Sequence, residues 1–215
     1  MDTGSLSQFL TLLDLSAAAV FAVSGALVAS RKEMDIVGFL WLGVITGVGG
    51  GTVRDVILDA PVFWIRDEAP LLVCIACAVL VYFTAHKIQS RYRLVLWLDA
   101  AGLAIVTVAG ASKGLEITGS PVIAVVTGIL TGTMGGIIRD TLGQEPSVIL
   151  RREIYVTASL AGAICYVLLT GLALDQVSAS VISFGLVFVV RGMAITMGLA
   201  LPIYKPRPGK DVNQR

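Results

Sequence analysis

Long apolar segments separated by short polar connections dominate the chain. Each is about as long as the roughly 20 residues that a helix needs to cross the hydrocarbon core of a bilayer. The segments are expected at roughly 9–30, 36–58, 69–86, 94–112, 120–142, 153–171 and 178–202. The pattern therefore predicts an all-α membrane protein with seven transmembrane helices, followed by a polar tail over 203–215.

Composition agrees with lipid as the surrounding medium. Of the 215 residues, 56% are hydrophobic and 14% are charged, and the mean hydropathy is +0.86. A soluble domain carries about 25% charged residues, so this chain has too little polar surface to cover itself. The net charge of +1 gives no sign of nucleic-acid binding. With one histidine and no cofactor motif, the sequence offers no catalytic set, and we expect neither an enzyme nor a cofactor beyond bound lipid.

The Lys and Arg residues collect on one side of the predicted bundle. The side with the N-terminus carries only Arg66 and Lys113. The other side carries eleven: Arg31, Lys32, Lys87, Arg91, Arg93, Arg151, Arg152, Lys205, Arg207, Lys210 and Arg215. Because cytoplasmic connections are enriched in positive charge, the count predicts an inner-membrane protein with its N-terminus outside and its C-terminus in the cytoplasm.

The sequence contains an internal repeat at an offset of 85 residues. The stretch GVGGGTVRD, Gly47 to Asp55, matches GTMGGIIRD, Gly132 to Asp140, and the same offset aligns Asp14 with Asp99. The repeats are predicted at 9–86 and 94–171, with 178–202 as an extra helix. Three helices are an odd number, so the two repeats are expected to be inverted relative to each other. Inverted repeats place a transport site near the midplane, at the interface between them.

Glycines crowd the second and fifth predicted helices. They are Gly47, Gly49, Gly50 and Gly51 in one helix, and Gly132, Gly135 and Gly136 in the other. Glycines four residues apart share a face and suit close helix packing. Each glycine also costs about 1 kcal/mol in a helix relative to alanine. We therefore expect these runs to bend or break both helices in mid-membrane, where irregular backbone lines a watery path.

Each glycine run ends in Arg-Asp, giving Arg54-Asp55 and Arg139-Asp140. Inversion puts Arg54 and Asp14 at one depth, and Arg139 and Asp99 at the other. We hypothesise two symmetry-related ion pairs, because ionisable groups inside a membrane are stable only when paired or wetted. They either flank a central path at its two mouths or serve packing alone, and the sequence leaves both readings open.

Arg191 is the single charge in the last predicted helix and has no counterpart in the repeat. Three roles suit it equally well. It could line a path, contact lipid head groups, or satisfy the backbone carbonyls of a broken neighbouring helix.

The paired glycine-arginine-aspartate motifs, the repeat and the seventh helix make this chain resemble a prokaryotic member of the trimeric intracellular cation (TRIC) channel family. The resemblance spans residues 9 to about 203. It implies a homotrimer with one pore per protomer, lined by second and fifth helices that kink at Gly49–Gly51 and at Gly135 and Gly136. The implied activity is permeation of monovalent cations, mainly potassium. Bacterial relatives of this kind are also described as transporters of small amino acids such as glycine.

Three functions follow from this reading. The first is a potassium channel, with potassium ions passing transiently and no resident metal. The second is an alternating-access transporter for a small zwitterion, to which an arginine would bind the carboxylate. The third is a scaffold protein without transport, which the ionisable residues and glycine runs disfavour. In each case membrane lipids are expected partners. The resemblance implies that two further copies of the chain are also partners, in a homotrimer.

Overall fold

The computed structural model describes residues 3–88, 90–146 and 154–200, and its elements are helices. They are α1 (Thr3–Arg31), α2 (Ile36–Ile57), α3 (Phe63–Arg66), α4 (Ala69–Thr84), η1 (Ala85–Lys87), α5 (Arg91–Thr118), α6 (Pro121–Leu142), α7 (Val156–Gly171) and α8 (Gln176–Met197). The helices α1, α2, α5, α6 and α8, and α4 together with η1, are long and apolar enough to cross a membrane, and α7 is a shorter apolar helix. The all-α membrane fold is confirmed, with one difference: the short helix α3 lies in the connection between α2 and α4.

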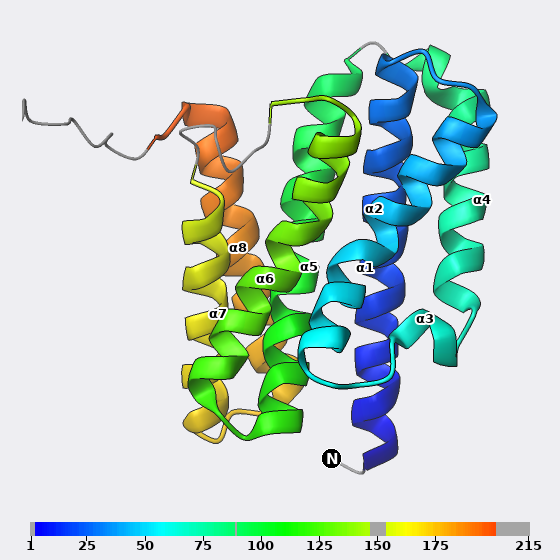
Figure 1. The fold of residues 1–215 in the computed structure, drawn as a ribbon. Helices are drawn as coiled ribbons and strands as arrows, with labels where there is room; N and C mark the ends of the chain where they lie inside the picture. The colour runs from blue at the N-terminus through cyan, green and yellow to red at the C-terminus, as the bar shows by residue number, and fades with distance from the viewer. Residues whose placement is uncertain (1–2, 89, 147–153, 201–215) are drawn as a thin grey trace, which may run out of the picture.

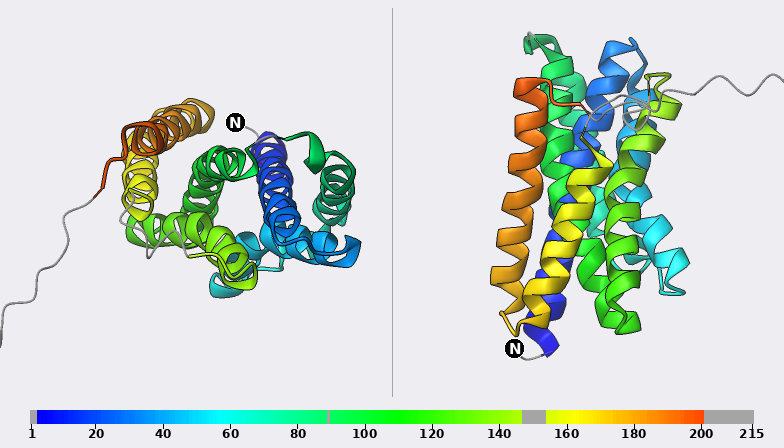
Figure 2. Two further views of the ribbon diagram at one scale, coloured as in Figure 1. Left: turned by 90° about the horizontal axis from the view of Figure 1, so that it is seen from above. Right: turned by 90° about the vertical axis from the view of Figure 1, so that its left-hand side faces the viewer.

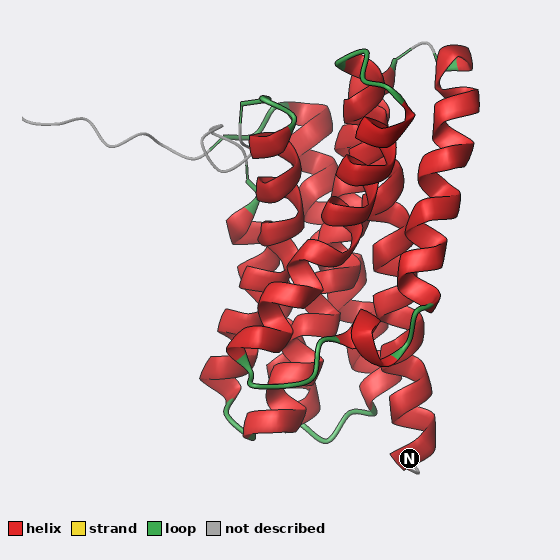
Figure 3. Cartoon of the chain, turned by 45° about the vertical axis from the view of Figure 1, so that its right-hand side comes forward, coloured by secondary structure: helices red, strands yellow, loops and turns green. Residues whose placement is uncertain are grey.

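The helices α1, α2, α5 and α6 form the centre of the bundle (Figure 1), and Figure 3 shows the same helical bundle from another side. The helix α1 packs on α5, and α2 packs on α6. On one flank α4 packs on α1 and α2, while on the other α7 packs on α5 and α6 and α8 packs on α5 and α7. Figure 2, seen from above, shows α4 and α8 at opposite edges of this arrangement.

The two halves of the chain run in opposite directions. In Figure 1, α1 ascends from the N-terminus, whereas α5, which holds the same place in the second half, descends. We call the two ends of the bundle the Asp14 end, where α1 begins, and the Asp99 end, where α5 begins. The halves α1–α2–α4 and α5–α6–α7 are therefore inverted relative to each other, and α8 is additional.

Several helix boundaries differ from those predicted. The helix α5 continues to Thr118 instead of ending at residue 112, and Gly119 closes it in the left-handed conformation with φ of 64°. The helix α8 ends at Met197, not at 202, because Gly198 has φ of 65°. The predicted tail over 203–215 lies outside the described residues. At its start α8 is capped by Asp175, whose carboxylate accepts a hydrogen bond from the backbone nitrogen of Ser178, which lowers the pKa of that carboxyl.

The two glycine-rich helices are not broken, which contradicts one of the two forms of the prediction that the glycine runs bend or break them. Both α2 and α6 are continuous α-helices through their glycine runs. The glycines instead remove side chains where helices cross: a methyl group built at Gly50 would lie 2.5 Å from the carbonyl oxygen of Thr131. At the symmetry-related position, a methyl group at Gly135 would lie 3.3 Å from the carbonyl oxygen of Thr46. Close helix packing therefore accounts for these glycines, because only a residue without a Cβ lets the backbones approach this far.

The same packing recurs within each half of the chain. A methyl group at Gly43 would lie 3.2 Å from the carbonyl oxygen of Ala22, and one at Gly128 would lie 2.9 Å from that of Thr107. These contacts join α2 to α1 and α6 to α5. They hold the central helices of each half in matching positions, and so they place the charged residues that follow each glycine run.

Candidate functional site

The Asp14 end holds a network of charges around Arg54. Its guanidinium donates to both carboxylate oxygens of Asp14, at 2.8 and 3.1 Å, and to Asp55 at 2.7 Å. Arg54 is 1% exposed and Asp55 is fully buried, whereas the side chain of Asp14 is 15% exposed. The predicted pair between Asp14 and Arg54 is confirmed, and its two-oxygen geometry is the strong form of an arginine–carboxylate contact.

Lys113 completes this network from the second half of the chain. Its ammonium group lies 2.8 Å from Asp55 Oδ1, while Asp55 Oδ2 accepts a hydrogen bond from the backbone nitrogen of Phe63 at 2.9 Å. Arg54 and Lys113 thus contribute two positive charges beside two carboxylates. Lys113 was predicted to lie in a loop, because the apolar segment was expected to end at residue 112. Leu115 and the cap at Gly119 were the signals that α5 continues.

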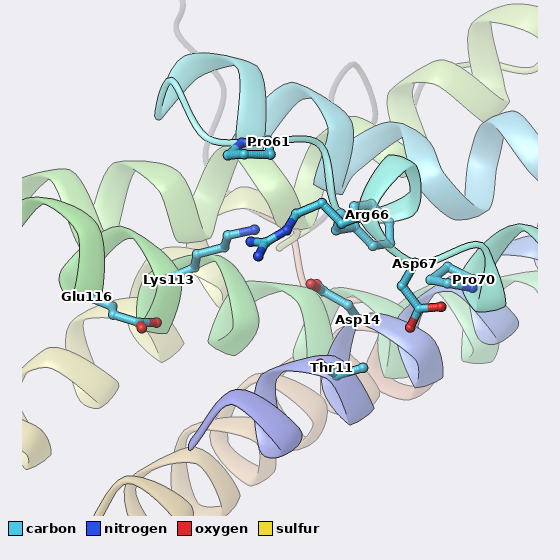
Figure 4. Close-up of a pocket in the computed structure, with 9 residues that line it drawn as sticks. Thr11, Asp14, Pro61, Arg66, Asp67, Pro70, Lys113 and Glu116 are labelled. Atoms are coloured by element: carbon cyan, nitrogen blue, oxygen red, sulfur yellow. The ribbon is translucent and has the colours of Figure 1, made fainter. Parts of the chain in front are cut away.

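A cavity of about 390 Å³ opens beside this network (Figure 4). It is lined by Thr11, Asp14, Pro61, Phe63, Arg66, Asp67, Pro70, Lys113 and Glu116. In Figure 4 the nitrogen atoms of Arg66 and Lys113 point toward the same space, and the carboxylate of Asp14 faces them. Within the part of the chain that the structure describes, neither Arg66 nor Glu116 forms an ion pair.

The Asp99 end repeats the arrangement around Arg139. This guanidinium donates to Asp99 at 2.8 Å and to Asp140 at 2.8 and 2.9 Å. It also donates to the hydroxyl of Ser24 on α1 at 2.6 Å, which ties the second half to the first. Arg139, Asp99 and Asp140 are all buried. The second predicted ion pair, between Asp99 and Arg139, is therefore also confirmed.

Backbone geometry fixes both networks in the same way. The carbonyl oxygen of Asp55 accepts from the nitrogen of Ala60 at 2.9 Å, and that of Asp140 accepts from Glu145 at 2.8 Å. The residues before these donors, Asp59 and Gln144, have φ of 50° and 49°. Each pair is 85 positions apart, so the repeat extends to the turns that end α2 and α6.

The two ends differ in what surrounds the shared Asp-Arg-Asp set. At the position that matches Lys113, the first repeat carries Val28, so the Asp99 end has no corresponding ammonium group. Tyr155 is present there instead, and its hydroxyl donates to Asp99 Oδ1 at 3.4 Å. The other oxygen, Asp99 Oδ2, is buried without a hydrogen-bond partner among the described residues. The Asp14 end therefore borders a cavity, whereas the Asp99 side chain is enclosed by protein.

Arg191 belongs to the surroundings of the Asp99 end. Its guanidinium lies over the ring of Tyr155, 5.1 Å from the centroid, and donates to the carbonyl oxygen of Ile154 at 3.5 Å. Among the described residues, this contact with a backbone carbonyl corresponds to one of the three roles left open by the sequence. The carbonyl lies just before α7, not in a broken helix, and Arg191 itself is fully buried.

The threonines near the glycine runs serve mainly their own helices. Thr46 donates to the carbonyl oxygen of Leu42 at 2.5 Å, and Thr131 donates to that of Thr127 at 2.6 Å. Such bonds are the common use of threonine within a helix. Among the described residues, no group of three or more His, Cys, Asp or Glu side chains is arranged to hold a metal ion.

Comparison with known proteins places the chain among membrane transport proteins. The family model described as "Glycine transporter" matches it twice, over residues 11–86 and 96–171. The inner membrane protein YadS of Escherichia coli K12 is 40% identical over 198 residues, covering 89% of this chain and 94% of YadS. A membrane protein of Vibrio cholerae is 39% identical over 211 residues, covering 94% of this chain and 86% of that protein.

Two solved structures share the fold along nearly their whole length. The TRIC trimeric intracellular cation channel orthologue from Rhodobacter sphaeroides is 49% identical with a TM-score of 0.86, covering 89% of this chain and 99% of that one. A prokaryotic TRIC channel crystallised in 0.5 M KCl is 28% identical with a TM-score of 0.84, covering 91% of this chain and all of that one. The fold of this chain thus recurs in known structures of one kind.

Proposed function

The chain belongs to the trimeric intracellular cation (TRIC) channel family, and from that premise we propose that it is a cation channel selective for potassium over anions. The path runs between the Asp14 end and the Asp99 end, along the faces where α1, α2, α5 and α6 meet. We propose that its lining includes the glycine-rich stretches of α2 and α6, at Gly49–Gly51 and at Gly135 and Gly136, which lie where these two helices cross. Asp14, Arg54, Asp55, Asp99, Arg139 and Asp140 form its two mouths.

The observation that carries this proposal is the pairing of every mouth arginine with two carboxylates. A bare arginine near a pore repels cations, whereas Arg54 contacts Asp14 and Asp55. Arg139 likewise contacts Asp99 and Asp140. The two carboxylates around Arg139 leave the set at the Asp99 end with one net negative charge, which attracts cations. At the Asp14 end Lys113 offsets that charge beside Asp55, so the network is neutral there and presents no bare positive charge.

We also propose the orientation and the assembly. Arg31, Lys32, Lys87 and Arg91 lie at the Asp99 end, and the excess of positive charge there favours its placement in the cytoplasm. The N-terminus is then outside and the C-terminus inside. A homotrimer with one path per protomer follows from the related channel, which is described as trimeric. Membrane lipids cover the exposed apolar side chains of α4 and α8, such as Leu72, Leu80, Val181 and Val189.

The test of the function is current through planar bilayers that contain the purified protein under a potassium gradient. Discrete steps that reverse near the potassium equilibrium potential are expected. Reversal near the chloride potential, or the absence of steps, would contradict the proposal. Orientation is tested with single cysteines at Glu116 and at Lys87, in a background without the three native cysteines. An impermeant maleimide added to intact cells should label the first and not the second.

A second candidate function is transport of a small zwitterion such as glycine. The cavity at the Asp14 end favours it, because Arg66 and Glu116 offer opposite charges to one space. The family model that matches the chain is described as a glycine transporter. Saturable glycine counterflow in liposomes that show no potassium current would establish this function in place of the channel.

A further inference from the structure

Phe21 lies where the four central helices meet. Its side chain projects from α1 and is 2% exposed. A methyl group built at Gly102 of α5 would lie 2.8 Å from Phe21 Cε2, and one built at Gly135 of α6 would lie 3.5 Å from Phe21 Cδ1. Gly135 in turn faces the carbonyl oxygen of Thr46 on α2. One aromatic ring thus occupies the space between α1, α5 and α6, beside the crossing of α2 with α6.

The residues around the ring are related by the internal repeat. Phe21 and Ala17 belong to one small apolar cluster with Val106. The offset of 85 matches Phe21 with Val106, and Ala17 with Gly102. Equivalent positions of the two halves therefore meet here, as expected on the pseudo-twofold axis of an inverted repeat. The symmetry is broken by size: the first half supplies the aromatic ring, and the second supplies the glycine that makes room for it.

The position of Phe21 along α1 places it between the two charged networks. Asp14 precedes it by seven residues, which is about 10 Å along a helix and nearly two full turns. The two side chains therefore share one face. Ser24, three residues further, accepts the hydrogen bond from Arg139 of the other network. A single helix thus carries, in order, a carboxylate of one mouth, the ring, and a partner of the other mouth.

We propose that Phe21 is the permeability barrier of the cation path in this conformation, an inference that rests on the proposed channel function. An apolar constriction stops ions because water leaves it and a cation without its hydration shell is too costly to move through. On either side of the ring, carboxylates at Asp14 and Asp99 attract cations. The buried apolar side chains that cluster with the ring are Ala17 and Val106, and neither carries an oxygen that could replace water.

The first test compares potassium efflux and single-channel current for the wild type, Phe21→Ala and Phe39→Ala. Phe39 is the matched control, because it is an equally large and buried ring that packs against Tyr82 away from the axis. Phe21→Ala is expected to increase potassium flux severalfold, and Phe39→Ala is expected to leave it unchanged. Phe21→Leu keeps most of the volume and should give an intermediate flux, which serves if the alanine variant does not fold.

A second test uses the repeat. The four substitutions Ala17→Gly, Phe21→Val, Gly102→Ala and Val106→Phe move the ring to the symmetry-related side of the axis and keep the composition of the cluster. This variant should recover the low flux of the wild type, whereas Phe21→Val alone should not.

The outcomes separate this inference from the function on which it rests. If the wild type conducts potassium and the Phe21 variants conduct equally, the ring is not the barrier while the channel function stands. If neither the wild type nor any folded Phe21 variant passes current, both are overturned. A weakly conducting wild type together with a more strongly conducting Phe21→Ala or Phe21→Leu variant supports both.

Discussion

The backbone of Gly50 on α2 touches the backbone of α6 at Thr131, where a methyl group on Gly50 would lie 2.5 Å from the threonine carbonyl oxygen. Both partners in this contact are backbone groups, so an added methyl group could be accommodated only by shifting one of the two helices. The contact joins the two halves of the chain at their crossing. It makes the glycine run of α2 a requirement of packing and leaves the helix continuous.

Gly50→Ala should therefore destabilise the protein by about 1–3 kcal/mol, the usual cost of overpacking a tight site. The gain in helix propensity, about 1 kcal/mol, offsets only part of this. Thermal unfolding in detergent measures the change. Gly185→Ala in α8 is the control, since a methyl group there meets nothing within 4 Å of the chain. Equal melting temperatures for the two variants would contradict the packing argument.

Asp99→Asn should cost more stability than Asp14→Asn. Asp99 and Arg139 are both buried, and removing one charge of a buried pair costs about 3–5 kcal/mol. Asp14 borders the cavity and its side chain is 15% exposed, so water can replace part of its contact with Arg54. The two variants are compared by thermal unfolding under the same conditions. Similar losses would show that the difference in burial between the two ends does not govern their energetics.

Lys113→Gln should raise potassium conductance. The substitution removes a positive charge that lines the cavity and lies 2.8 Å from Asp55, so the local concentration of cations at the Asp14 end increases. The increase should shrink at high ionic strength, where salt screens the charge. Single-channel recording at two potassium concentrations measures both effects. Lys87→Gln is the control for the loss of one positive charge, because Lys87 is exposed and lies at the opposite end of the bundle. A drop in conductance for Lys113→Gln would contradict this account of the mouth.

Arg191→Lys should weaken the attachment of α8 to the start of α7 although it preserves the charge. Lysine has no planar guanidinium to stack on Tyr155 while donating to the carbonyl oxygen of Ile154. The loss of such a buried stacking contact is about 1–2 kcal/mol. Thermal unfolding measures the total loss of stability. Faster hydrogen exchange at the start of α7 would show that the loss arises there. A variant as stable as the wild type would exclude this role for Arg191.

Much of the architecture follows from the sequence alone. The lengths of the apolar segments specify spanning helices, because a bilayer has a fixed thickness. The offset of 85 residues pairs Asp14 with Asp99 and Arg54 with Arg139, and three helices per repeat require inversion. Since inversion fixes which residues share a depth, both ion pairs could be predicted before any coordinate was known.

Other features depend on distances between helices that are far apart in the sequence. A glycine run can break a helix or admit a neighbouring one, and only the approach of Thr131 to Gly50 shows that packing prevails here. The bond from Lys113 to Asp55 crosses from one half to the other and has no counterpart in the repeat, so no periodicity predicts it. The sequence alone does not distinguish Phe21 from the other apolar residues of α1. Its place on the axis is decided by the tertiary contacts of Gly102 and Gly135, because a local pattern gives the face of a helix but not what lies against it.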